Sequence, residues 1–135
     1  MARKLALIDP RRQDEGAADG VVQLLHTHLA TLAFEQFVVA GCDGRGRLHS
    51  LAEQSGSAQD VAGILAAVRR ALAPPAVTHL IIAHNHPCHC TNVSLADRET
   101  TRRVAAVGRL GGGGLLGHLV FAGEEIVSFR ALGLI

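Results

Sequence analysis

The stretch VTHLIIAHNHP, residues 77–87, decides how this chain folds and where its chemistry lies. Its branched apolar residues have the length and β-branching of a buried strand. Residues two apart in an extended backbone point the same way, so His84 and His86 would share one side of the strand's end. Pro87 then ends the strand, because proline has no N–H to donate. The stretch therefore predicts two neighbouring imidazoles at the edge of a sheet.

A second pair of polar residues follows, separated from His86 by seven residues. Ser94 has the side chain of a helix N-cap, and Asp97 falls three residues later, in the first turn of that helix. Two imidazoles on a strand end and one carboxylate on a helix start can converge on one point. Two nitrogens and one oxygen, with a fourth position left to water, are the ligand set of a catalytic zinc site.

Each half of this pattern also has a purely structural interpretation. Ser94 and Asp97, taken alone, would more often form a capping box, in which the acid accepts from a backbone N–H. His84 and His86, taken alone, would more often be turn residues with satisfied hydrogen bonds. The combination of a strand, His-x-His-Pro, a short loop and a helix-starting Ser-x-x-Asp favours the metal site.

The same spacing resembles the JAMM signature of the JAB/MPN metallo-hydrolases. Three flanking stretches are similar to the bacterial RadC-like branch of that family: FEQFVVAGCDGRGRL (34–48), AHNHP (83–87) and GHLVFAGEEIVSFRALGLI (117–135). The resemblance covers about residues 20–135. It implies a mixed α/β fold with a mainly antiparallel sheet, flanking helices and cytidine-deaminase-like layering. It also implies a zinc-dependent hydrolase of peptide or isopeptide bonds, with a protein or peptide as substrate.

The resemblance assigns roles to five residues. His84, His86 and Asp97 would bind Zn²⁺. Glu35 stands where the family has the glutamate that shuttles a proton from the zinc-bound water to the leaving amine, although alone it would be taken as a solvated residue at a strand start. Ser94 would stabilise the oxyanion through its hydroxyl, which could instead serve only to cap the helix.

The loop between the two halves of the motif departs from the family. The family's loop is usually rich in Ser, Gly, Asp and Pro, whereas this chain has Cys88-His89-Cys90. A thiolate there could fill the fourth zinc position and turn a catalytic site into a structural one. It could equally form a redox-sensitive lock, or the side chains could point away. A second departure is Gly117, which replaces the acid that the family often has before His118.

Composition limits the other functions. The chain has 135 residues, a net charge of +1, no Trp or Tyr and four Phe, so neither a strong electrostatic attraction to nucleic acid nor a base-stacking platform is expected. The apolar runs fall short of a membrane span, and the N-terminus has no secretory pattern. Three cysteines do not suggest a disulfide framework. We expect a soluble, reduced, cytoplasmic protein.

Periodicity and turn residues predict the remaining elements. Residues 1–17 would be a polar N-terminal arm and residues 18–135 one RadC-like JAB/MPN domain. A hairpin turn is expected at Asp43-Gly44-Arg45-Gly46, a helix N-cap at Ser57 and a C-cap at Gly111. Helices are predicted at 21–32, 58–73 and 95–110, with further strands at 34–40, 48–53, 115–121 and 125–129.

Two other classes of function stay open at this stage. The degenerate loop would suit a non-catalytic metal-binding or protein-interaction module. RadC-like proteins are also linked to DNA repair or DNA metabolism, and longer members carry a helix-hairpin-helix region that the first residues of this chain do not resemble. Near-zero net charge argues against strong DNA binding. An apolar sheet edge and short helices would suit a homodimer.

Overall fold

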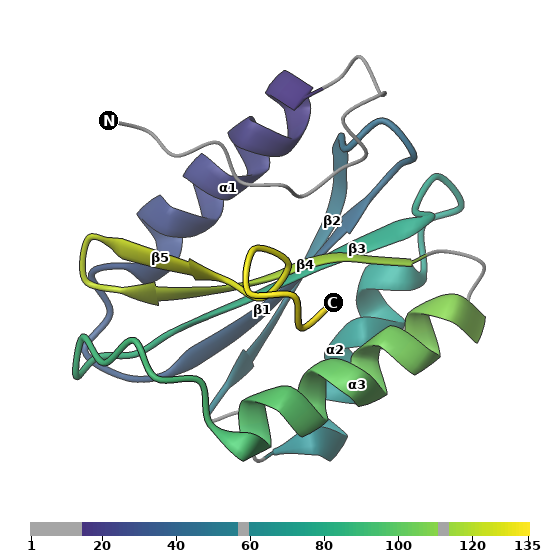
Figure 1. The fold of residues 1–135 in the computed structure, drawn as a ribbon. Helices are drawn as coiled ribbons and strands as arrows, with labels where there is room; N and C mark the ends of the chain where they lie inside the picture. The colour runs from purple at the N-terminus through teal and green to yellow at the C-terminus, as the bar shows by residue number, and fades with distance from the viewer. Residues whose placement is uncertain (1–14, 57–59, 111–113) are drawn as a thin grey trace.

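The computed structural model describes residues 15–56, 60–110 and 114–135. These residues form a five-stranded sheet with helices on both faces (Figure 1). The elements are α1 (Glu15–Leu29), β1 (Gln36–Cys42), β2 (Leu48–Ser55), α2 (Val61–Leu72), β3 (His79–Asn85), α3 (Leu95–Leu110), β4 (Gly114–Ala122) and β5 (Glu125–Ser128).

The strands lie in the order β2-β1-β3-β4-β5, which places β3 at the centre. β3 is antiparallel to β1, with Phe37 opposite His84, and parallel to β4, with Val120 opposite His84. A parallel neighbour requires a crossover, and α3 supplies it between β3 and β4. All other pairings are antiparallel, so the predicted mixed α/β fold with a mainly antiparallel sheet is confirmed.

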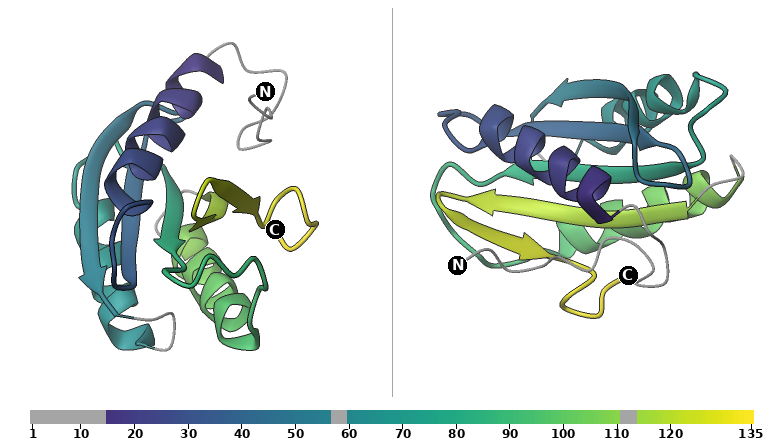
Figure 2. Two further views of the ribbon diagram at one scale, coloured as in Figure 1. Left: turned by 90° about the vertical axis from the view of Figure 1, so that its left-hand side faces the viewer. Right: turned by 90° about the horizontal axis from the view of Figure 1, so that it is seen from above.

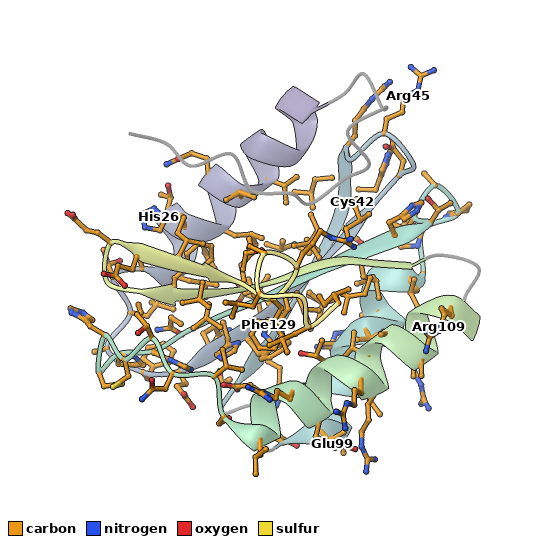
Figure 3. All side chains as sticks on the ribbon, in the orientation of Figure 1. His26, Cys42, Arg45, Glu99, Arg109 and Phe129 are labelled. Atoms are coloured by element: carbon orange, nitrogen blue, oxygen red, sulfur yellow. A yellow bond between two sulfur atoms is a disulfide. The ribbon has the colours of Figure 1, made fainter. Side chains whose placement is uncertain are left out.

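The central strands alternate their side chains between two apolar layers. Phe37 and Val39 of β1 pack toward α2 and α3, whereas Val38 and Ala40 pack toward α1. Figure 2 shows these helices on opposite faces of the curved sheet. The buried Phe129 lies inside the molecule, while Arg45 projects from the β1–β2 turn (Figure 3). Every residue of β1 is buried, because both of its faces are covered.

Most predicted elements are confirmed, and the differences are at their ends. α1 begins at Glu15, inside the segment predicted as an arm. The prediction missed this first part of the helix because the residues before Val21 show no apolar periodicity. α2 begins at Val61 with Asp60 as N-cap, whose carboxylate accepts from the Gly63 N–H at 3.1 Å. The predicted start at residue 58 is therefore wrong, since Asp caps as well as Ser does.

Three further expectations have separate outcomes. The strand predicted from Phe34 begins at Gln36, since Phe34 belongs to the loop before it and is 56% exposed. The turn at Asp43 is confirmed: its carboxylate accepts from the backbone N–H groups of Arg45 and Arg47 at 2.9 and 3.0 Å. Ser57 and Gly111 lie outside the described residues.

Among the described residues, none of the helices combines the length and the apolar character that crossing a membrane requires.

Gly41 allows α2 to approach the sheet closely. A Cβ atom at this position would lie 2.2 Å from the Ser50 hydroxyl oxygen and 2.5 Å from the Ala71 carbonyl oxygen. Those two atoms are themselves joined by a hydrogen bond of 2.5 Å, which ties β2 to the end of α2. A side chain larger than hydrogen at this position would therefore push the helix off the strands.

We expect Gly41→Ala to lower the free energy of unfolding by about 1–3 kcal/mol, because the added methyl group meets backbone that cannot move aside. Gly20→Ala is the matched control, since nothing lies within 4 Å of its added carbon. That exposed helix position should gain about 0.5–1 kcal/mol. Urea unfolding of the three proteins measures both changes, and equal stability of wild type and Gly41→Ala would contradict the close approach.

Candidate metal centre

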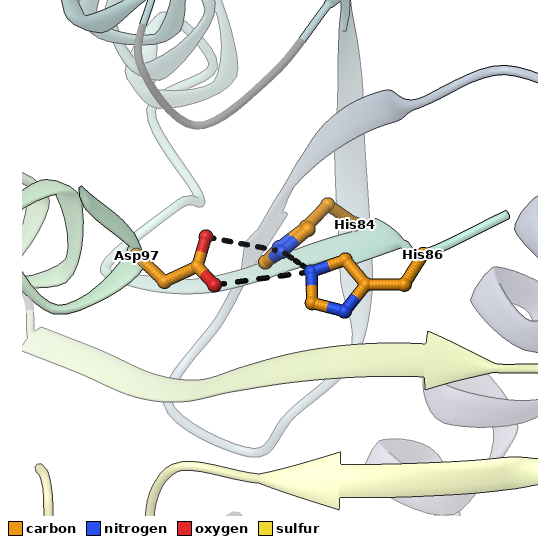
Figure 4. A group of neighbouring side chains, drawn as sticks. All are labelled: His84, His86 and Asp97. Carbon is orange, nitrogen blue, oxygen red and sulfur yellow. Dashed lines mark hydrogen bonds and ion pairs between the residues drawn. The ribbon is translucent and has the colours of Figure 1, made fainter. Parts of the chain in front are cut away.

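The side chains of His84, His86 and Asp97 converge at the end of β3 (Figure 4). One ligand atom from each lies within 4.8 Å of the others. His84 Nε2 lies 3.1 Å from His86 Nε2 and 3.4 Å from Asp97 Oδ1, and His86 Nε2 lies 3.8 Å from Asp97 Oδ2. Their side chains are 2%, 12% and 5% exposed, so the three groups meet largely out of water.

The helix start orients the carboxylate. The Asp97 N–H donates to Ser94 Oγ at 3.0 Å, and the Ser94 N–H donates to Asp97 Oδ2 at 3.1 Å. This is the reciprocal capping box that the sequence offered as an alternative to a metal site. The capping box does not exclude a metal site, because it uses Oδ2 while Oδ1 faces His84.

His86 is held with one ring nitrogen available. Its Nδ1 lies 2.7 Å from the backbone carbonyl oxygen of Cys90. A carbonyl can only accept, so Nδ1 carries the hydrogen and the lone pair of the neutral ring lies on Nε2. That nitrogen is the one that faces His84 and Asp97.

His84 is backed by two residues that sequence reasoning did not select as part of the site. Its Nδ1 lies 2.8 Å from Nε2 of His118 on β4, and Nδ1 of His118 lies 2.6 Å from the Thr101 hydroxyl. The Thr101 hydroxyl in turn lies 2.8 Å from the backbone carbonyl oxygen of Asp97. Thr101 follows Asp97 by four residues, so the helical period places the two on one face, a signal that the sequence does contain.

Burial and neighbouring charges set the protonation of the site. Burial alone would raise the pKa of Asp97, but its contacts with His84 and the hydrogen bond from the Ser94 N–H hold it well below its usual range. Complete burial lowers the pKa of His118 well below the ordinary histidine value. The site therefore combines an ionised carboxylate with a neutral buried imidazole.

The chemistry of these donors fits a divalent cation. Two imidazole nitrogens and a carboxylate oxygen are ligands that zinc and several other divalent metals accept. Phe37 stacks on the His84 ring at 5.4 Å with an interplanar angle of 8°, and Phe129 stacks on His118 at 4.1 Å. The ring orientations are thus fixed by packing as well as by hydrogen bonds, and the group is able to hold a metal ion.

Glu35 lies just before β1 and is not a member of the ligand group. The β1–β3 pairing ends at Phe37–His84; Glu35 precedes that pair by two residues on one side, and His86 follows it by two residues on the other. The buried Asn85 fixes the backbone on both sides of Glu35: its Oδ1 accepts from the Gln36 N–H at 2.8 Å and its Nδ2 donates to the Phe34 carbonyl at 2.8 Å. Sequence reasoning missed this contact.

The cysteine-containing loop differs from the expectation of reduced cysteines. Cys88 and Cys90 form a disulfide, while Cys42 is free and buried. The residue between them, His89, has a φ of 60°, a left-handed conformation that turns the chain tightly enough to bring the two sulfurs together. In this state neither sulfur is a thiolate ligand, and Cys88, Cys90 and Ser94 are all exposed.

Comparison with known proteins agrees with this geometry. The family model of the RadC-like JAB domain matches residues 16–134. A UPF0758 protein of Cupriavidus pinatubonensis is 36% identical over 126 residues, which cover 92% of this chain and 54% of that protein. A UPF0758 protein of Bordetella petrii is 33% identical and is covered to 56%. The UPF0758 protein YkfG of Escherichia coli is 31% identical over 139 residues and is covered to 87%.

The chain thus spans little more than half the length of the first two relatives, which bear only a family label in their names. The match to the family model extends over all eight helices and strands except the first residue of α1. It includes both histidines and the aspartate that converge at the end of β3. This chain belongs to the RadC-like JAB domain family.

Proposed function

We propose that this chain is a zinc-dependent hydrolase of the JAMM type that cleaves peptide or isopeptide bonds in a protein substrate. The observation that carries the proposal is the convergence of His84 Nε2, His86 Nε2 and an Asp97 carboxylate oxygen. The His86 ring already donates its hydrogen to the Cys90 carbonyl, so its lone pair points into the group. Buried lone pairs that converge without a hydrogen between them repel one another unless a cation lies among them.

Zinc in this position would polarise a substrate carbonyl and make its bound water acidic. Glu35 would accept the proton from that water and pass it to the leaving amine. The amide of Asn85 supports this role, because it fixes the peptide groups on both sides of Glu35 just before the strand that pairs with β3. A backbone fixed in this way reduces the reorganisation that the Glu35 carboxylate needs before it can act on a proton.

Ser94 would donate its hydroxyl hydrogen to the developing oxyanion. In the capping box Ser94 Oγ accepts from the Asp97 N–H. That contact uses a lone pair of the oxygen and not the hydroxyl hydrogen. Capping and oxyanion stabilisation are therefore compatible, and Ser94 is exposed to an approaching substrate.

A second candidate is a metal-binding interaction module without catalysis. It is favoured by the disulfide between Cys88 and Cys90, which lies in the loop that joins the two halves of the ligand set. The Cys90 carbonyl also holds His86, so the altered loop contacts the site directly. A metal that is retained without any hydrolysis would select this candidate.

An association with DNA is the weaker proposal. The exposed face of α3 carries arginines, but Arg102 and Arg103 both contact Glu99, at 3.8 and 3.3 Å. Glu99 projects from α3 away from the sheet (Figure 3). A face with interleaved acids attracts phosphate less than a continuous basic stripe does. Duplex binding in a gel shift at low salt would support this role, and the absence of a shift would exclude it.

The first prediction from the proposed centre concerns metal content. Purified protein should contain about one zinc ion per chain, and His86→Ala and Asp97→Ala should each lose it, because two remaining protein ligands bind zinc weakly. His28→Ala is the matched control. This exposed histidine lies on α1, which packs on the face of the sheet opposite α3, and its ring contacts Glu53 and no member of the ligand group. Elemental analysis measures the ratio. A wild-type protein that takes up no zinc even on reconstitution would overturn the centre.

The second prediction concerns Glu35. In a screen of fluorogenic peptides and lysine-linked isopeptides, Glu35→Gln should lower kcat by about 10²–10⁴-fold, because an amide cannot carry the proton. Its zinc content should equal that of wild type, since Glu35 is not a ligand. Glu53→Gln, the same change at an exposed site on β2, should leave kcat unchanged. Equal kcat for all three proteins would exclude Glu35 as the shuttle.

The third prediction concerns the two loop cysteines. The double variant Cys88→Ser, Cys90→Ser should retain about one zinc ion per chain, because the sulfurs are bonded to each other and the ligand group consists of other residues. Treatment of wild type with dithiothreitol should likewise leave the zinc in place. Zinc lost from the double variant would show instead that a thiolate is a ligand.

A further inference from the structure

We propose that Thr101 and His118 are positioning residues that determine which ring nitrogen of His84 carries its hydrogen. The inference rests on the proposed metal centre, because only a nitrogen without a hydrogen can bind a metal. Neither residue belongs to the ligand group. Both are buried, Thr101 at 3% and His118 at 0% exposure, so each must satisfy its polar atoms inside the protein.

The direction of the hydrogen bonds is set at Thr101. Its hydroxyl oxygen lies 2.8 Å from the backbone carbonyl oxygen of Asp97. Two oxygens at this distance share a hydrogen, and a carbonyl has none to give, so the hydroxyl donates. This contact from one helix residue to the carbonyl four positions earlier is a normal one for threonine.

The next contact then has only one direction. The hydrogen of Thr101 is committed to Asp97, so its oxygen can only accept from Nδ1 of His118, 2.6 Å away. Nδ1 of His118 therefore carries the hydrogen. A completely buried imidazole is neutral, because burial disfavours the charged form, so Nε2 of His118 has a free lone pair.

The last contact determines the state of His84. Nε2 of His118 lies 2.8 Å from Nδ1 of His84, and a lone pair there requires a hydrogen on His84. A His84 ring that binds a metal keeps only one hydrogen, which is thus on Nδ1, and its lone pair is on Nε2. That atom is the one that faces His86 and Asp97. The series of hydrogen bonds thus starts at the Asp97 backbone carbonyl and ends at the His84 ring.

The Thr101 hydroxyl makes the difference between the two possible directions. Without it, His118 could equally donate from Nε2 to His84, which would leave the His84 hydrogen on Nε2. Such an N–H would point at Asp97 Oδ1, 3.4 Å away, and the carboxylate would favour this arrangement in the metal-free protein. The nitrogen that should bind the metal would then be blocked.

The matched pair Thr101→Val and Thr101→Ser tests the proposal. Valine has nearly the same shape as threonine but no hydroxyl, while serine keeps the hydroxyl. In metal-free protein, long-range ¹H–¹⁵N NMR should find a hydrogen on Nδ1 of His84 in wild type and Thr101→Ser, and none on Nδ1 in Thr101→Val. With Zn²⁺ alone, a chelator competition should give a Kd about 10–100-fold weaker for Thr101→Val. Thr101→Ser should bind as wild type does.

Two results would overturn the proposal: a wild-type His84 without a hydrogen on Nδ1, or a folded Thr101→Val whose His84 Nδ1 hydrogen and zinc affinity equal those of wild type. If Thr101→Val does not fold, the wild-type spectrum and Thr101→Ser still decide the direction of the hydrogen bonds. The NMR measurement needs no metal. A wild-type protein that binds no Zn²⁺ would therefore overturn the metal centre, while the tautomer of His84 would still be measured separately.

Discussion

Hydrogen bonding of β3 to a strand on each side is the constraint on which the rest of the structure depends. Its antiparallel pairing with β1 places Phe37 beside His84 and brings the start of β1 to the end that carries His86. Its parallel pairing with β4 places His118 behind His84. An edge strand could have only one of these neighbours. The central position therefore gives His84 both an aromatic partner and a hydrogen-bonding partner in the protein interior.

The parts of the site that a short stretch of sequence encodes could be predicted from it. The apolar run before His84 predicts the strand, and Ser94 with Asp97 predicts the helix start, because the contacts involved lie within a few residues. The contacts missed join residues far apart along the chain: His84 with His118, 34 positions later, and Asn85 with Gln36, 49 positions earlier. They depend on strand order and register, which periodicity does not specify.

Errors at the element ends have a similar local cause. Ser57 and Asp60 are both residue types that cap helices, and residue type alone does not decide between them. In the structure Asp60 caps α2. The family resemblance supplied the roles of Glu35 and Ser94, which composition and spacing alone would have left as surface residues. The disulfide of Cys88 and Cys90 required a left-handed backbone at His89, which nothing in its residue type demands.

The amide of Asn85 has a consequence for how this family could vary. The Asn85 side chain binds the peptide groups before and after Glu35. A residue inside the His-x-His motif therefore sets how far the Glu35 backbone lies from the two histidines. The segment between α1 and β1 need only be long enough for the residues beside Glu35 to reach the Asn85 amide. Length changes between α1 and β1 should therefore be tolerated, whereas the residue between the two histidines is not a free spacer. In this protein the middle residue of His-x-His, Asn85, positions the backbone of Glu35 relative to the two histidines.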